Sequence, residues 1–414
     1  MERLGVMTPI EKYADLIGQA ALDRIFAKAR PIFGMRVVHI NSTYNGGGVA
    51  EMLDPLSILM NQVGIETEWH LLQGELDFFS VTKKMHNALQ GAEIHQTQRK
   101  MQIYEEVLRK NAARMHLNRF DRVVVHDPQP LFLINHYTKN CPWIWRCHID
   151  LSRPNPTLMN YLMPVMDKYD AVVVSAEQYK QRLQVPQRIF MPAINPFSIK
   201  NKELTEDEVD ERLWHYGIPT DLPLVVQVSR FDIWKDPQGV IDAFKIARRQ
   251  VNATLVLLGN VATDDPEGPA IYKSLLDQQE DRIILISKDD TCLVNALQRK
   301  AAVVLQKSLR EGFGLTVTEA MWKGTPVIGG NVGGIPLQIE DGVNGFLVSD
   351  VEEAADRIVR LLKDRRLRER MGRHARQTVI EKFLLTRLLE QYIDLFRAFE
   401  TRFFLKDQGP GDRA

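Results

Sequence analysis

Cysteine is scarce in this chain, and long apolar runs are absent. Only three cysteines occur in 414 residues, namely Cys141, Cys147 and Cys292. They are too few for a disulfide framework and lack the spacing of a metal site, which favours a reducing compartment. No stretch approaches the roughly 18 apolar residues of a membrane-spanning helix, and Met1-Glu-Arg-Leu-Gly5 does not read as a signal peptide. We therefore expect a cytoplasmic protein with no membrane partner.

An excess of charge of either sign is also missing. Lys+Arg and Asp+Glu both total 53, so the formal net charge is zero. This balance excludes a globally basic surface for nucleic acid, and any cation that matters must act locally. No Asp-x-Asp pair stands at a predicted strand end. We expect no obligatory metal cofactor, with Mg at most stimulatory.

The length predicts more than one domain. At 414 residues the chain exceeds the size at which a single core keeps growing. Buried strands alternate with helices in each half, which predicts an α/β protein with doubly wound parallel sheets. The pattern breaks between about 196 and 219, so we predict an N-terminal domain over 1–200 and a C-terminal domain over 201–383. The final segment, 384–414, carries an apolar stripe that suits packing against the first domain.

Three consecutive glycines, Gly46, Gly47 and Gly48, separate a predicted strand (35–41) from a predicted helix (49–62). Such a turn lets the backbone approach a phosphate closely. The pattern is not Gly-x-Gly-x-x-Gly, and no acidic residue is placed as a ribose ligand after the second strand, which disfavours a nicotinamide enzyme. A merely flexible turn is the alternative.

Polar side chains recur where the strands of the first half end: Asn41, His126, Asp127, His148 and Asp150. One such residue would usually anchor a loop, whereas several on successive parallel strands converge on one crevice. The segment Pro128-Gln-Pro-Leu131 after the third strand predicts the start of a helix.

Two cations of the second half flank one turn between a strand and a helix. Arg230 ends the predicted strand 223–230, and Lys235 precedes a helix that begins at Pro237. On an open surface they would be solvated charges. At the end of a buried strand beside a helix N-terminus, the pair predicts a phosphate clamp.

The most informative stretch is Arg310-Glu-Gly-Phe-Gly-Leu-Thr-Val-Thr-Glu319. It predicts a glycine-punctuated loop and then a helix over 315–323. Glu311 lies in the loop and Glu319 in the helix, where an N-terminus can receive an anionic, hydroxylated ligand. An acidic loop that caps an ordinary helix is the alternative.

The string Glu311-Gly-Phe-Gly-Leu315 with Glu319 resembles the signature of retaining nucleotide-sugar glycosyltransferases, particularly glycosyltransferase family four. The triple glycine, His148 and the pair Arg230 and Lys235 stand in the order of that family, so the resemblance spans nearly the whole chain. It implies the GT-B fold, in which two Rossmann-like domains face each other across a deep interdomain cleft.

The resemblance also implies roles for single residues. The glycines Gly46, Gly47 and Gly48, with Arg230 and Lys235, would hold the diphosphate of the donor, and Glu319 would bond the ribose hydroxyls. The donor sugar would lie against Glu311 and the loop formed by Gly312, Phe313, Gly314, Leu315 and Thr316. His148 would also bond this sugar. The catalytic candidates are His148, Glu311, Arg230 and Lys235.

Two further motifs narrow the resemblance. Val123-Val-Val-His-Asp-Pro-Gln129 is similar to the acceptor motif of trehalose-6-phosphate synthases, although Gln129 stands where those enzymes have a histidine. The segments 39–51 and 145–150 resemble trehalose glycosyltransferring synthases and the related retaining trehalose phosphorylases. The acceptor-binding candidates are therefore Asp127, Gln129 and Asp150.

The resemblance implies transfer of glucose from UDP-, ADP- or GDP-glucose to free glucose, with formation of α,α-trehalose. It favours attack from the face that the phosphate leaves, while a double displacement through a carboxylate stays open. A trehalose phosphorylase, a related family-four enzyme with another sugar acceptor, and a non-catalytic nucleotide-sugar sensor are the alternatives. The expected partners are small molecules (nucleotide-glucose, glucose and trehalose), and a homodimer is a candidate assembly.

Overall fold

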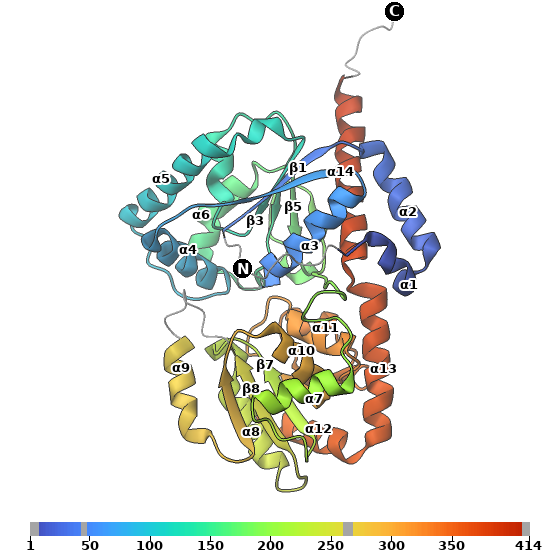
Figure 1. Cartoon of the computed structure of the whole chain (residues 1–414). Helices are drawn as coiled ribbons and strands as arrows, with labels where there is room; N and C mark the ends of the chain where they lie inside the picture. Colours follow the sequence, from blue (N-terminus) through green and yellow to red (C-terminus); the bar gives the residue numbers. More distant parts are fainter. Residues whose placement is uncertain (1–7, 43–47, 260–267, 408–414) are drawn as a thin grey trace, which may run out of the picture. The chain divides into compact units, whose positions relative to one another are not determined.

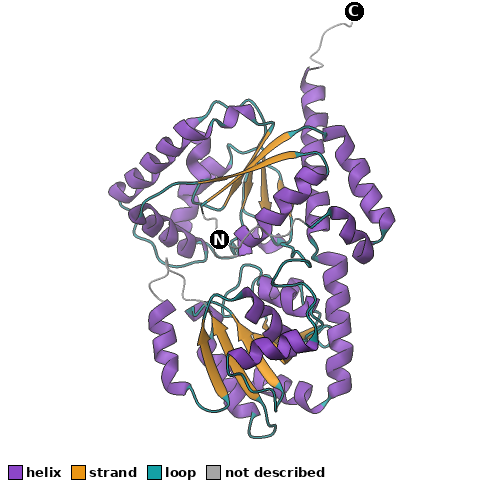
Figure 2. Ribbon diagram, viewed as in Figure 1, coloured by secondary structure: helices purple, strands orange, loops and turns teal. Residues whose placement is uncertain are grey.

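The computed structural model describes residues 8–42, 48–259 and 268–407, with side chains described as far as residue 400. These residues form two compact units. The N-terminal unit holds 8–192 together with 385–407, and the C-terminal unit holds 193–384. In each unit, helices cover both faces of a parallel sheet (Figures 1 and 2). The α/β class with two doubly wound parallel sheets is thus confirmed.

The sheet of the N-terminal unit has the strand order β2-β1-β3-β4-β5-β6, and all its strands are parallel. The strand order reverses beside β1, which places a topological switch point between β1 and β3. The strands are β1 (Arg36–Asn41), β2 (Glu66–Leu71), β3 (Arg122–His126), β4 (Trp143–Arg146), β5 (Ala171–Val174) and β6 (Gln187–Ile189).

Helices α4, α5 and α6 cover one face of this sheet, and α2, α3 and α14 lie on the other face (Figure 1). Thr97 caps α5 by accepting from Lys100 N, and Asn155 caps α6 in front of a proline. The helices are α1 (Ala14–Ile17), α2 (Gln19–Ala29), α3 (Gly48–Gln62), α4 (Leu76–Leu89), α5 (Gln98–Met115), α6 (Pro156–Met166) and α14 (Leu385–Asp407).

The prediction of a helix that begins at Pro128 is wrong. The chain bends over 127–130 and continues as a short 3₁₀ segment, Leu131–His136. Asp127 adopts a left-handed backbone with φ 63°, and Pro130 restricts Gln129 to extended conformations. The left-handed residue alone does not prevent a helix, since Asp236 with φ 50° directly precedes the helix that begins at Pro237. The difference is Pro130, which disfavours a helical conformation at Gln129.

The C-terminal unit repeats the architecture with the strand order β12-β11-β10-β7-β8-β9. Its strands are β7 (Leu224–Val228), β8 (Thr254–Gly259), β9 (Ile283–Ser287), β10 (Ala301–Gln306), β11 (Val327–Gly330) and β12 (Gly345–Val348). Its helices are α7 (Glu206–His215), α8 (Pro237–Ala247), α9 (Gly268–Leu275), α10 (Thr291–Lys300), α11 (Leu315–Trp322), α12 (Val351–Lys363) and α13 (Arg365–Lys382). The switch point of this sheet lies between β7 and β10.

Each unit has its own core. In the N-terminal unit, the sheet face with Val125 and Trp145 packs against Phe78, Tyr104 and other side chains of α4, α5 and α6. In the C-terminal unit, valines and leucines of the sheet pack against α8, α12 and α13. These rigid layers fix the positions of the loops that follow the strands.

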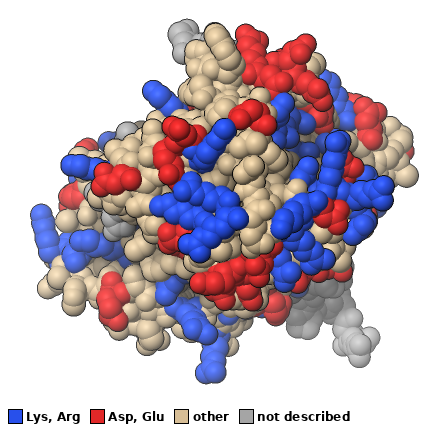
Figure 3. Space-filling view, turned by 90° about the horizontal axis from the view of Figure 1, so that it is seen from below, with Lys and Arg blue, Asp and Glu red and all other residues tan. Residues whose placement is uncertain are grey.

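The surface carries both signs of charge. On the face that Figure 3 draws, basic and acidic side chains are interspersed, as expected for equal totals of 53. No helix in the described ranges is long and apolar enough to cross a lipid bilayer.

Candidate functional site

Asp127 and His148 meet at the carboxyl edge of the N-terminal sheet. They follow β3 and β4, and His148 N donates to Asp127 Oδ1 at 2.7 Å. Burial raises the pKa of Asp127 to about 6, against the opposing effects of this bond and of the Arg146 charge. The carboxyl group therefore titrates close to neutral pH, where it can exchange a hydrogen bond with a hydroxyl ligand.

A chain of three imidazoles runs from the sheet interior to this edge. His39 Nδ1 lies 2.9 Å from His126 Nε2, and His126 Nδ1 lies 2.9 Å from His148 Nε2. His39 and His126 are buried, whereas His148 is partly exposed. Burial is the largest cause that lowers the pKa of each ring, so the neutral form of all three imidazoles is favoured.

A buried arginine lies on the same sheet face as this chain. Arg146 pairs in register with His126, and its Nη2 donates to Phe190 O at 2.6 Å and Ser175 Oγ at 3.1 Å. Arg146 Nε and Nη1 find no partner among the described residues. The positive charge of Arg146 contributes to the lowered pKa of both His126 and His148.

The other predicted residues of this half are placed differently. Asp150 accepts from Ser152 N at 2.8 Å, and no contact joins it to Asp127 within the described chain. Gln129 follows Asp127 in the bend, and its buried Oε1 lacks a partner in the same ranges. Gly48 begins α3, whereas Gly46 and Gly47 lie outside the described residues.

Lys235 and Glu311 contact each other at the carboxyl edge of the C-terminal sheet. Lys235 Nζ lies 2.5 Å from Glu311 Oε2, between the loop after β7 and the loop before α11. The same oxygen accepts from Gln306 Nε2 and Ser308 Oγ, each at 3.3 Å. Both Lys235 and Glu311 retain little side-chain exposure, at 18% and 10%. This cation therefore stands fixed beside the N-terminus of α11.

Arg230 lies two residues after the end of β7, with 47% of its side chain exposed. Its Nη2 is 3.5 Å from Asp232 Oδ2, and Asp232 also caps the following turn by accepting from Trp234 N at 2.8 Å. Unlike Lys235, the guanidinium is thus accessible to a ligand from solvent.

A glycine begins α11. Gly314 has φ 84°, and a side chain there would press on Glu311 Cγ at 3.1 Å. Glycine also supplies no side-chain cap, so the amides of Leu315 and Thr316 in the first turn face the end of the loop. Gln338 Nε2 donates to Phe313 O at 2.5 Å and holds the loop, including Gly312, in place. The predicted helix over 315–323 is confirmed as Leu315–Trp322.

Glu319 is buried in α11, with 6% of its side chain exposed. Its Oε1 lies 3.4 Å from Lys200 Nζ. One turn further, Lys323 Nζ donates to Glu319 O at 3.2 Å and to Asn201 Oδ1 at 2.8 Å. Burial lowers the pKa of Lys323 to about 7.

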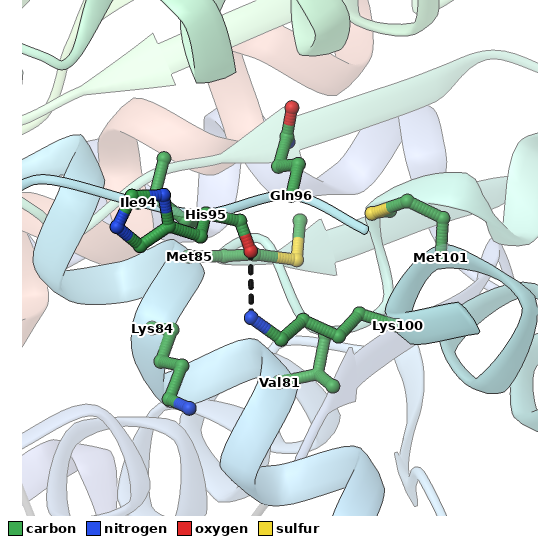
Figure 4. Close-up of a pocket in the computed structure, with 8 residues that line it drawn as sticks. All are labelled: Val81, Lys84, Met85, Ile94, His95, Gln96, Lys100 and Met101. Carbon is green, nitrogen blue, oxygen red and sulfur yellow. Dashed lines mark hydrogen bonds between the residues drawn. The ribbon is translucent and has the colours of Figure 1, made fainter. Parts of the chain in front are cut away.

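The small cavity in Figure 4 does not belong to these groups. It lies in the N-terminal unit between α4 and the start of α5, and its volume is about 10 Å³. This volume suits one water molecule. Lys100 Nζ donates to His95 O at 2.6 Å across it, and none of the predicted site residues lines it.

The sequence alone did not reveal several residues at these edges. They are His39, Arg146, Gln306, Ser308, Lys200 and Tyr392, the last of which packs edge-on against His39 with ring centroids 5.7 Å apart. A signal existed for two of them, because His39 and Arg146 interrupt otherwise apolar strands, Val-Val-His-Ile and Trp-Ile-Trp-Arg.

Solved structures share this architecture at low identity. The sucrose-phosphate synthase of Thermosynechococcus elongatus matches with a TM-score of 0.69 at 18% identity, over 89% of this chain and 100% of its own. The Anabaena protein HepE in complex with UDP and glucose matches with a TM-score of 0.65 at 17% identity, over 88% and 100%. Two parallel α/β units with polar strand ends, together with these neighbours, define the two-domain GT-B fold.

Comparisons of sequence are more specific. Residues 39–181 match the family described as trehalose synthase, N-terminal domain, and residues 208–378 match glycosyl transferases group 1. The trehalose synthase of Thermococcus litoralis is 44% identical over 399 residues, which cover 94% of this chain and 97% of the relative. The trehalose phosphorylase of Pleurotus pulmonarius is 24% identical, over 92% of this chain and 59% of its own length. The chain belongs to the trehalose synthase family of glycosyltransferases.

Proposed function

We propose that this protein transfers glucose from a nucleoside diphosphate glucose to free glucose, reversibly and with retention, to form α,α-trehalose. The similarity to the trehalose synthase of Thermococcus litoralis supports the reaction. The observation that carries the chemistry is the Lys235–Glu311 contact of 2.5 Å beside the glycine-capped N-terminus of α11. It prepares a fixed positive charge for a departing diphosphate.

The donor half of the reaction belongs to the C-terminal unit. Negative charge develops on the β-phosphate oxygen as the glycosidic bond breaks. Lys235 and the first amides of α11 stabilise this charge without reorganising, because they are held before the ligand arrives. The accessible Arg230 adds a second positive charge. Glu319 bonds the ribose hydroxyls, and the loop from Gly312 to Thr316 supports the donor sugar.

Attack proceeds from the face that the phosphate leaves, with the acceptor proton passing to a phosphate oxygen. The environment of Glu311 supports this route over a double displacement. One of its oxygens is occupied by Lys235, Ser308 and Gln306, and a carboxylate so engaged is a weak nucleophile. Glu311 instead orients Lys235 and contacts the donor sugar.

The acceptor half belongs to the N-terminal unit. Asp127 orients the attacking hydroxyl of glucose, since its pKa of about 6 lets it share a proton with that hydroxyl near neutral pH. Gln129 and Asp150 add hydrogen bonds to other hydroxyls of the acceptor, and His148 contacts the donor sugar.

The test is product analysis. The purified protein is incubated with glucose and, separately, with UDP-, ADP- and GDP-glucose, each with and without EDTA. We expect trehalose in at least one mixture and its persistence in EDTA, with added Mg at most raising the rate. The absence of trehalose from every mixture would refute the proposal.

Phosphorolysis of trehalose is the second candidate, because inorganic phosphate can occupy the same cation pair. It is the weaker one, since the phosphorylase of Pleurotus pulmonarius is only 24% identical and this chain spans 59% of its length. A parallel mixture of trehalose and inorganic phosphate separates the two candidates, because only a phosphorylase releases glucose 1-phosphate from it.

A further inference from the structure

The histidine chain (His39, His126 and His148) is a linear array in which every contact joins an Nδ1 to an Nε2. The two N···N distances are both 2.9 Å, which is hydrogen-bond length. The His126 and His148 rings are nearly parallel, with an interplanar angle of 11° and centroids 5.3 Å apart. The chain starts inside the N-terminal unit and ends at the residue that we propose to contact the donor sugar.

Only two proton arrangements fit a neutral chain. Each neutral imidazole carries one proton, and each contact requires one donor and one acceptor. If His126 carries its proton on Nδ1, then His39 and His148 must also carry theirs on Nδ1. If His126 carries it on Nε2, then all three rings carry the proton on Nε2. The state of the buried end therefore decides the state of the exposed end.

The buried end discriminates between these arrangements. His39 is fully buried, and its Nε2 has no partner among the described residues. With protons on Nε2, this atom would be a buried N–H without an acceptor. With protons on Nδ1, it is a buried lone pair without a donor. Orphaned N–H groups are the rarer of the two in native structures, and they lose a full hydrogen bond.

We propose that His39 and His126 are positioning residues that hold His148 as the neutral Nδ1–H tautomer. His148 then presents a hydrogen-bond donor at the carboxyl edge of the sheet, and it binds an oxygen that accepts. This inference rests on the proposed function only for the identity of that oxygen, a hydroxyl of the donor sugar. The tautomer itself follows from the N-terminal unit alone.

The neighbours of the chain keep it neutral. Arg146 lies on the same sheet face as His126, with its charge directed against any imidazolium. Tyr392 covers His39 from α14 with its ring edge-on, at an interplanar angle of 82°. His148 therefore donates a hydrogen bond as a neutral ring, because the contacts of the chain fix its tautomer. No second buried cation is then needed beside Arg146.

The first experiment measures the tautomer without any substrate. Nitrogen–proton correlation spectra of the whole protein with ¹⁵N-labelled histidine distinguish Nδ1–H from Nε2–H rings, and His148→Gln identifies the signal of His148 among the ten histidines. We expect Nδ1–H for His148 in the wild type and the Nε2–H form, which a solvated imidazole prefers, in His126→Phe. An Nε2–H form of His148 in the wild type overturns the proposal, whether or not the protein makes trehalose.

The second experiment asks whether His126 acts through His148. We expect His126→Phe to lower kcat about 10- to 100-fold, the usual loss when a group that orients an active side chain is removed, with a smaller change in KM for the nucleotide-glucose. His126→Gln keeps a donor and an acceptor, so it should recover part of the loss and serve if His126→Phe does not fold. His70→Gln is the matched control, since the His70 ring pairs with Glu68 and packs edge-on against Phe120, neither of which belongs to the histidine chain.

The decisive comparison is a double-mutant cycle. In a His148→Ala background, His126→Phe should change kcat by less than about 2-fold, because the residue through which it acts is gone. A loss as large as in the wild-type background would mean that His126 only supports the fold, and it would overturn the positioning role.

Discussion

Lys235 Nζ lies 2.5 Å from Glu311 Oε2 and joins two loops whose residues are 76 positions apart in the chain. The residues just before them are joined as well, since the Arg310 guanidinium lies 4.7 Å from the centre of the Trp234 ring. Leu309 N donates to Trp234 O at 2.8 Å and completes the connection. The loops after β7 and β10 therefore form one rigid support, which is what preorganised charge stabilisation requires.

We expect Lys235→Met to lower kcat/KM for transfer about 10²- to 10³-fold, the loss typical of removing one group that stabilises developing charge. The change also leaves Glu311 without its cation, which should lower the free energy of unfolding by about 1–3 kcal/mol. Steady-state kinetics and urea unfolding measure the two effects separately.

The control for Lys235 is Lys245→Met, since Lys245 is a lysine of α8 in the same unit and its amine donates to Gln278 rather than to a site residue. It should change kcat/KM by less than about 2-fold, because Lys245 contacts none of the predicted site residues. If Lys235→Met were as active as this control, Lys235 would not stabilise the leaving group.

Asp127→Asn should raise the stability of the protein and lower its transfer activity. Asparagine tolerates the backbone φ of 63° at this position, so the bend is kept. The pKa of Asp127 is raised from 3.8 to about 6, so the folded protein binds its proton more tightly than the unfolded chain does. Its contribution to stability is full below pH 3.8 and is lost as pH rises through about 6.

Relative to the wild type, Asp127→Asn should therefore gain stability between about pH 4 and pH 6 and hold that gain above it. Solvent partly screens the pKa shift of a half-buried residue. We therefore expect a gain of about 1–2 kcal/mol, which is less than the full pKa shift would give. Transfer activity should fall at every pH because the acceptor hydroxyl loses its partner. Urea unfolding at pH 4, 6 and 8 tests the first expectation, and a difference that does not vary with pH contradicts it.

Much of the fold follows from local sequence signals. The helix predicted over 315–323 is found as Leu315–Trp322, because the glycine before it and Gly324 after it mark its ends locally. The bend after Asp127 was not predicted, because its geometry depends on the bonds that Asp127 makes to His148 and Trp145. Such bonds join residues of different strands and leave no mark in the local pattern.

Candidate site residues could be predicted from the sequence only where they lie at the ends of strands or helices. Glu311, Lys235 and Asp127 stand beside helix or strand ends, where chemistry is expected. Arg146 and His39 lie within strands that read as apolar, and their role depends on α14, which packs over them from more than 200 residues away. A contact of such long range cannot be read from one sequence without covarying relatives.

Glu319→Gln tests the ribose contact. A hydrogen bond to a carboxylate is about 1 kcal/mol or more stronger than one to a neutral amide, so the Kd of UDP should rise about 10-fold. Calorimetric titration of UDP without acceptor measures this directly. Glu369→Gln is the control, since Glu369 lies on α13 and pairs with the exposed Arg365. An unchanged Kd in Glu319→Gln would show that Glu319 serves only to hold Lys200.

Two arginines, Arg146 at the end of β4 and Arg387 in the first turn of α14, should differ in how much stability is lost when their charge is removed. Arg387 Nη2 donates to Met191 O at 2.8 Å and to Pro192 O at 3.0 Å, and its Nη1 donates to Gln391 Oε1. Arg146 makes bonds only through Nη2 and buries Nε and Nη1 without partners in the described residues. Burial and the charge of Arg146 lower the pKa of Arg387, so the two cations destabilise each other.

We therefore expect Arg387→Met to lower the free energy of unfolding by about 2–4 kcal/mol, because two carbonyl groups lose charged donors. Arg146→Met loses comparable bonds but removes two donor nitrogens that have no partner among the described residues, and it relieves the repulsion. Its effect should lie within about 1 kcal/mol of zero. Urea unfolding of both variants and of the double variant measures the difference. Equal destabilisation by the two single variants would contradict this account, since it would mean that the unpaired nitrogens of Arg146 carry no penalty.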